Sequence, residues 1–250
     1  MDAEAHPWPQ HGSGAVPIEN DAPAEGGVRR GVGAVGFLLD SIRRRRSGRI
    51  GLWALVVGLT LGGVWLIAYP FITNFWADRI QNGLQDDFAA LQANADPNAT
   101  GFTASNRPTE GQALTRLRIP KLGVNVIVVE GTSGNALRAG AGHFHDTALP
   151  GEPGNVAIAG HRTGYGEPFR HIEKLEKGDQ IILETPFATY VYKVGPPFDG
   201  HRNPWIVPPT DILVKGPTAD AVVTLVTCDP PGTSKNRLIV RGWLVREIDA

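Results

Sequence analysis

Residues 221–232, AVVTLVTCDPPG, contain a run of apolar and β-branched residues that ends at a turn. Side chains of this kind from Val222 to Thr227 predict a strand, because they suit a half-buried pleated surface. The segment Asp229-Pro230-Pro231-Gly232 must turn, since proline lacks the N–H that a strand ladder needs. The strand therefore delivers Cys228, the single cysteine of the chain, to a loop where a substrate can reach its thiol.

Other short runs rich in Val and Ile alternate with Gly/Pro turns between residues 116 and 250. They are Leu117–Ile119, Val124–Val129, Val156–Ala159, Gln180–Leu183, Thr189–Val194 and Arg237–Val245. Only a brief segment, Phe169–Leu175, is expected to be helical. About eight strands at this spacing predict a mainly β fold with short helices, either an antiparallel barrel or a sandwich.

The overall composition excludes several classes of protein. The 250 residues carry 24 Lys and Arg against 25 Asp and Glu, and a formal net charge of -1 gives no basic field for nucleic acid. One cysteine excludes an intramolecular disulfide framework and any multi-cysteine metal cage. We therefore expect no nucleic-acid partner and no metal site.

The N-terminal part predicts a membrane anchor. Residues 1–49 lack apolar periodicity, which predicts a disordered tail, and they end in arginines at positions 43–46 and 49. Residues 50–73 form the predicted anchor, because Ile50 to Tyr69 is almost wholly apolar and about 30 Å long as a helix. A buried core helix or a cleaved signal peptide would fit this length and its flanks less well.

The flanking charges predict the orientation of that anchor. Arginines precede it, so the positive-inside rule places the tail in the cytoplasm and the body outside, in a single-pass membrane protein. Residues 74–115 predict a stalk helix and linker, with Ile80, Leu84, Phe88 and Leu91 on one helical face. This helix either connects the membrane to the body or packs on the body. Residues 116–250 form the predicted catalytic body.

The residues alone leave Cys228 open between a nucleophile and a small buried hydrophobe. A solitary thiol outside the cytoplasm is an oxidation liability, which favours the nucleophile. His161 ends an apolar strand just after Gly160 and is the best candidate for moving protons. Arg237 opens a strand nine positions after Cys228, so a hairpin would return it beside the thiol to stabilise an oxyanion. For each of these two, an ordinary surface residue is the alternative.

These motifs together resemble the sortase family of cysteine transpeptidases. The resemblance rests on Thr224-Leu225-Val226-Thr227-Cys228, on Arg237 followed by Leu-Ile-Val, and on Ala-Gly before His161. It covers about residues 116–248, and further matching stretches are IPKLG at 119–123, TALPG at 147–151, GHR at 160–162 and PFR at 168–170.

The resemblance implies an eight-stranded β-barrel with Cys228 as nucleophile, His161 as general acid and base, and Arg237 as substrate and oxyanion stabiliser. Two more residues are weaker candidates for substrate binding. His143 resembles a groove histidine of some sortases, with a surface-loop histidine as the alternative. Thr227 points to the opposite strand face from Cys228, so it would act through its backbone or a hydroxyl bond, or serve only as a strand residue.

The implied reaction cleaves a Leu-Pro/Ala-x-Thr-Gly-type sorting signal between Thr and Gly through a thioester. The protein is then transferred to an amine of a peptidoglycan precursor or another acceptor, without a cofactor. Calcium sites occur in some sortases, but no acidic cluster here predicts one. A housekeeping enzyme similar to class E or D fits best, although the loop after Cys228 departs from the class E pattern.

Three rival functions stay open to different degrees. An L,D-transpeptidase places Ser/Thr-x-Gly before its cysteine, and Leu225-Val226-Thr227 does not match that pattern. An extracytoplasmic cysteine peptidase would use water as the acceptor, which the sequence does not distinguish. A catalytically inert peptide-binding barrel would lack one of the three catalytic residues, and all three are present.

Overall fold

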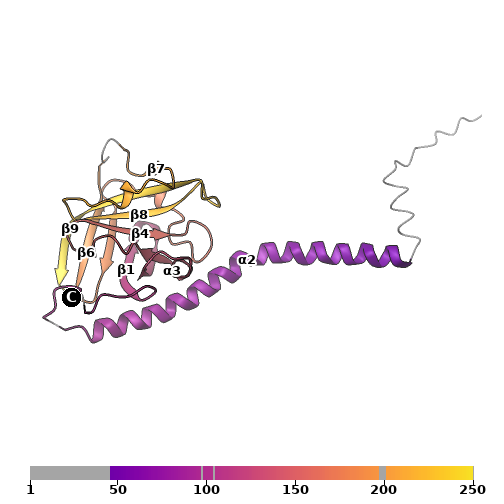
Figure 1. Cartoon of the computed structure of the whole chain (residues 1–250), viewed down its shortest axis with the longest axis horizontal. Coiled ribbons are helices and arrows are strands. Elements are labelled where there is room, and N and C mark those ends of the chain that lie inside the picture. The colour runs from indigo at the N-terminus through magenta and orange to yellow at the C-terminus, as the bar shows by residue number, and fades with distance from the viewer. Residues whose placement is uncertain (1–45, 97, 104, 197–200, 250) are drawn as a thin grey trace, which may run out of the picture. The chain divides into compact units, whose positions relative to one another are not determined.

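The computed structural model describes residues 46–96, 98–103, 105–196 and 201–249. The body is one sheet of nine strands (Figure 1). They are β1 (Ala113–Ile119), β2 (Val124–Glu130), β3 (Ala141–His143), β4 (Asn155–Gly160), β5 (Gln180–Glu184), β6 (Ala188–Val194), β7 (Trp205–Val207), β8 (Val222–Asp229) and β9 (Asn236–Asp249).

Eight of the strands close into a barrel, which confirms the predicted mainly β fold. Their order is β6-β5-β1-β2-β3-β4-β8-β9, and pairing of β9 with β6 completes the circle. The short strand β7 adds to β9 alone. Closure removes the free edges that an open sheet of this size would expose.

Two pairs of strands are parallel, so the expectation of a purely antiparallel sheet is wrong. These are β2 with β3 and β4 with β8. A parallel pair needs a crossover connection, which the chain supplies through the short helix α3 (Gly134–Arg138) and through strands β5 to β7. The parallel pairing of β4 with β8 positions the candidate active site.

The barrel core is filled by the alternate side chains of the strands together with one loop segment. Phe169, Ile172 and Leu175 are buried in that core, although the helix predicted over Phe169–Leu175 is only the single turn η2 (Ile172–Lys174). Burial of every third residue suits this tighter turn. The remaining short turns are η1 (Pro120–Leu122) and η3 (Leu213–Lys215).

The predicted anchor and stalk form one helix, α2 (Arg46–Ala93). Among the described residues it is the one helix long and apolar enough to cross a membrane. Residues 1–45 of the predicted tail lie outside the described part of the chain, and residues 46–49 already belong to α2.

The later part of α2 packs on the barrel through a face that differs in part from the predicted one. Leu84 and Phe88 are buried, as the periodicity predicted, but Ile80 and Leu91 are exposed. Gln81 is buried as well, where its side chain amide donates to the carbonyls of Ile127 (3.0 Å) and Ala139 (2.6 Å) and its oxygen accepts from the N–H of Ile127 (2.8 Å). The docked stripe is Thr73, Ala77, Gln81, Leu84 and Phe88.

Candidate active site

The parallel pairing of β4 with β8 brings His161 and Cys228 to the same edge of the barrel. The register of this pair runs from Asn155 opposite Val222 to Ala159 opposite Val226. Carboxyl ends of parallel strands meet at one edge of a sheet. His161, which follows β4, and Cys228, near the end of β8, therefore emerge side by side.

The hairpin of β8 and β9 adds Arg237 to this edge. Its Cα is the antiparallel partner of the Cys228 Cα, as the sequence predicted. One guanidinium nitrogen, Nη1, donates to the carbonyls of Ser234 (3.0 Å) and Asn236 (2.9 Å), which orients the group. Arginine carries five N–H donors, so others stay available to a substrate.

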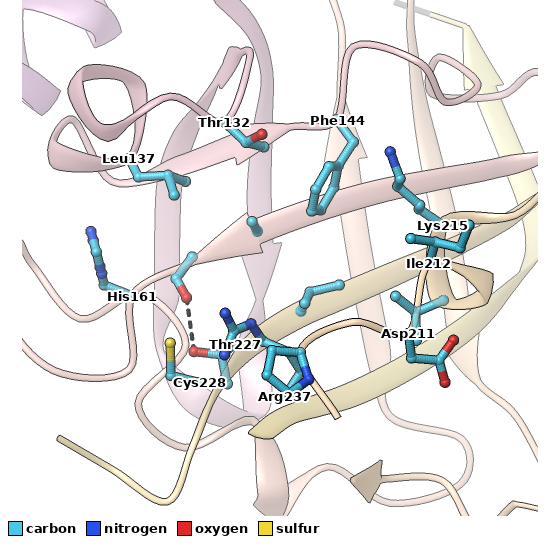
Figure 2. A pocket seen from close by; sticks show the side chains of 15 residues that line it. Thr132, Leu137, Phe144, His161, Asp211, Ile212, Lys215, Thr227, Cys228 and Arg237 are labelled. Carbon is cyan, nitrogen blue, oxygen red and sulfur yellow. Dashed lines mark hydrogen bonds between the residues drawn. The ribbon is translucent and has the colours of Figure 1, made fainter. Parts of the chain in front are cut away.

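A pocket of about 330 Å³ joins these three residues to an apolar groove. Figure 2 shows Cys228 and His161 at one end of the pocket, and Ile212 and Lys215 toward the other. Phe144 contributes to the wall between them. The sequence did not single out these wall residues, because they come from separate loops. The one local feature that pointed to a groove wall was the apolar pair Ile212-Leu213, which stands in a loop rich in proline.

Thr227 also lines the pocket, but its side chain is buried. Its hydroxyl donates to the carbonyl of Gly160 at 2.8 Å, the dashed line in Figure 2. This bond holds the residue before His161 against the residue before Cys228. A hydroxyl bond at the strand end was one of the possibilities for Thr227, and substrate binding by this residue stays a prediction.

His143 lies elsewhere, away from the residues that line the pocket. Its ring is fully buried, with Nδ1 2.9 Å from a carboxylate oxygen of Glu130 and Nε2 2.9 Å from the carbonyl of Ala148. A ring so enclosed does not meet a substrate in the groove, and we do not keep His143 as a groove residue. Burial alone would raise the pKa of Glu130, but hydrogen bonding to His143 brings it below its usual value. The signal missed in the sequence was this acidic residue at the end of an apolar strand.

His161 is half-buried at the pocket and has an altered acidity. Burial lowers its pKa below the usual value, because the charged ring loses water. Its ring centroid lies 5.0 Å from that of Tyr165. The neutral imidazole is therefore favoured near neutral pH, the form that can accept a proton from a thiol.

The arrangement of a thiol, an imidazole and a guanidinium at one pocket edge suits acyl transfer. A family model for the sortase domain matches residues 117–245, which is more than half of the chain. The chain belongs to the sortase family. Sortases are cysteine transpeptidases, and the match contains Cys228, His161 and Arg237.

Two sortases of Streptomyces coelicolor are similar along much of this sortase. SrtE1 is 39% identical over 182 residues, covering 68% of this chain and 48% of the relative, so the alignment spans about half of SrtE1. SrtE2 is 33% identical over 224 residues, covering 81% of this chain and 87% of the relative.

Solved sortase structures share the fold. SrtF sortase from Corynebacterium diphtheriae has a TM-score of 0.56 at 29% identity, over 62% of this chain and 93% of that one. A Clostridium perfringens sortase D5 transpeptidase has a TM-score of 0.55 at 27% identity, over 67% and 99%. The barrel expected from the resemblance is thus confirmed.

Proposed function

We propose that this sortase is a membrane-anchored transpeptidase that cleaves a Leu-Pro/Ala-x-Thr-Gly-type sorting signal between Thr and Gly and joins the protein to a cell-wall amine. The observation that carries the proposal is the meeting of Cys228, His161 and Arg237 at one pocket. In this proposal α2 holds the enzyme in the cell membrane as a single span. The arginines at positions 43–46 and 49, before the apolar part of the span, support an orientation with the N-terminus in the cytoplasm and the barrel outside.

In the first half-reaction the thiol proton of Cys228 passes to the imidazole of His161. The sulfur attacks the carbonyl carbon of the substrate threonine, and free donors of Arg237 stabilise the negative oxygen that develops. The C–N bond to glycine then breaks. His161 gives its proton to the leaving nitrogen, and a thioester remains on Cys228.

In the second half-reaction an amine of a peptidoglycan precursor, or another amine, attacks the thioester carbon. His161 accepts the amine proton and passes it to the departing sulfur, so the C–S bond breaks and the free thiol returns. None of these steps uses a cofactor.

The shape of the pocket supports a peptide with apolar residues before the cleaved bond. Its wall carries Leu137, Phe144 and Ile212, with more apolar than polar surface. An apolar groove with a polar end fixes the orientation of an extended peptide through few directed contacts. Cys228, His161 and Arg237 supply the polar groups at the reacting end, and Asp211 and Lys215 supply charged groups toward the other end.

The decisive experiment offers the full chain, in detergent, a sorting-signal peptide with and without an added amine. Mass spectrometry should show a new amide to the amine, and a thioester on Cys228 when acceptor is withheld. Cys228→Ala is the matched inactive control. Hydrolysed peptide alone, even at high amine concentration, would identify a cysteine peptidase, and an unchanged peptide would identify a binding protein.

A further inference from the structure

Arg162, the residue after His161, has a buried charged side chain that the proposed mechanism does not use. It is 7% exposed. Its Nη1 donates to a carboxylate oxygen of Asp229 and to the carbonyl of Cys228 (3.3 Å), and its Nη2 donates to Glu173 (3.1 Å). One guanidinium thus joins the loop of the histidine to the backbone of the cysteine itself.

These contacts extend the register of β4 with β8 beyond the point where the backbone pairing of the two strands ends. Backbone pairing of β4 and β8 ends with Ala159 opposite Val226. Gly160 and Thr227 are the next two residues in the same register, 67 positions apart, and the threonine hydroxyl links them. Arg162 and Asp229 are linked at the same separation of 67. His161 and Cys228 are the pair between these two links.

The two links therefore enclose the catalytic pair from both sides. The hydroxyl bond fixes the residue before each catalytic group, and the guanidinium fixes the residue after each. Backbone pairing between His161 and Cys228 would keep both residues within the regular sheet. The side-chain links preserve the register of the two strands and leave the side chains of His161 and Cys228 free to point into the pocket.

Stability alone is a poor explanation for this arginine. Burying a guanidinium costs free energy that its ion pairs only partly offset, and apolar replacements of such groups are often neutral. Moreover, the Nε of Arg162 is buried with no hydrogen-bond partner among the described residues. Arg162 contributes little to the free energy of unfolding but connects the two segments that carry His161 and Cys228, which indicates a role in the active site.

We propose that Arg162 is a positioning residue that clasps the His161 loop to Cys228 and Asp229 and thereby sets the alignment for proton transfer between imidazole and sulfur. The inference rests on the proposed function. Proton transfer needs the sulfur and the imidazole nitrogen within hydrogen-bond reach, and a displacement of about 1 Å can cost about 10²-fold in rate. The clasp acts on that separation without touching the substrate.

The test compares Arg162→Gln with the control Arg116→Gln in the full chain. Arg116 lies in an ion pair with Glu184 on the barrel (Nε to Oε2, 3.9 Å) and is not among the pocket residues. Its buried Nε, like that of Arg162, has no hydrogen-bond partner in the part of the chain that the structure describes. We expect Arg162→Gln to lower kcat about 10²-fold with little change in KM, and Arg116→Gln to leave both within about threefold. Arg162→Lys should recover only part of the loss, because a single ammonium nitrogen does not replace the two separated nitrogens, Nη1 and Nη2, that reach different segments.

A second readout separates positioning from mere structural support and needs no peptide. The rate of Cys228 alkylation by iodoacetamide is measured against pH, where contact with His161 shapes the profile. Arg162→Gln should give the profile of His161→Ala, and Asp229→Asn, which keeps the arginine but weakens its anchor, should shift the same way.

Three results would overturn the proposal. They are a wild-type alkylation profile in both Arg162→Gln and Asp229→Asn, a loss of melting temperature with kcat unchanged, and equal losses of kcat in Arg116→Gln. If instead the wild-type chain processes no peptide, the proposed function fails, while the alkylation profiles still decide on the clasp.

Discussion

Replacing Phe88 with alanine tests whether α2 is a structural part of the barrel domain. The ring is fully buried in a cluster with Leu84, Ile127 and Val129, and the guanidinium of Arg116 lies over it at 5.6 Å. Core Phe→Ala substitutions cost about 3–5 kcal/mol, and each kcal/mol shifts the melting temperature of a domain of this size by about 2–4 °C. We therefore expect Phe88→Ala to melt about 6–20 °C lower.

Thermal unfolding followed by circular dichroism measures this shift. Leu91→Ala is the matched control on the same helix, because Leu91 is 45% exposed and an exposed position should change the free energy of unfolding by no more than about 0.5 kcal/mol. Peptide cleavage by Phe88→Ala, assayed well below its melting temperature, should match wild type, since Phe88 is not among the residues that line the pocket. A shift of less than about 2 °C would refute the docking of α2 and the magnitude derived from it.

Three further predictions concern the site and the helix. Cys228→Ala should abolish thioester and product, and Arg237→Ala should lower kcat about 10²–10³-fold without full rescue by Arg237→Lys, as steady-state assays would show. A protein that starts at residue 75 should stay soluble, whereas one that starts at residue 100 should aggregate or melt earlier, because it loses Gln81 and Phe88, as light scattering would detect. Burial lowers the pKa of His161 below 6.5, so its contribution to the free energy of unfolding is present above pH 6.5 and is lost as the pH falls. NMR titration should give the lowered pKa, and His161→Gln should weaken the pH dependence of unfolding.

Most of the barrel was predictable because its longer strands are continuous apolar runs. Strands β3 and β7 were not, since three residues each are too few to show a period, and β3 includes a glycine. They exist because longer neighbours offer free hydrogen-bonding edges, which is a tertiary effect. The parallel pairing of β4 with β8 was also hidden, because local pattern carries no information on which distant strand becomes the partner.

The three proposed catalytic residues could be selected from the sequence because each lies where an apolar strand ends or begins, and the structure brings them to one pocket. The surrounding shell was not. In the sequence, Arg162 and Asp229 look like ordinary surface charges. Only the fold shows that these two residues, 67 positions apart, form an ion pair. For His143, the sequence predicted a groove position, whereas the pairing of β2 with β3 sets the ring beside Glu130, 13 residues earlier, in the interior.

The position of the catalytic pair follows from a conflict between rigidity and access. A fully paired strand is rigid, but its alternating side chains face either the core or the outer surface, and its backbone leaves no room for a substrate. Pairing of β4 with β8 stops at Ala159 and Val226, one residue before the side-chain links begin. His161 and Cys228 thus take their register from the most rigid part of the barrel while their side chains reach the pocket. A variant that restored pairing between β4 and β8 at this point would gain order and lose the pocket, so the site lies just beyond the last residues of β4 and β8 that pair with each other, while β9 still holds Cys228 opposite Arg237.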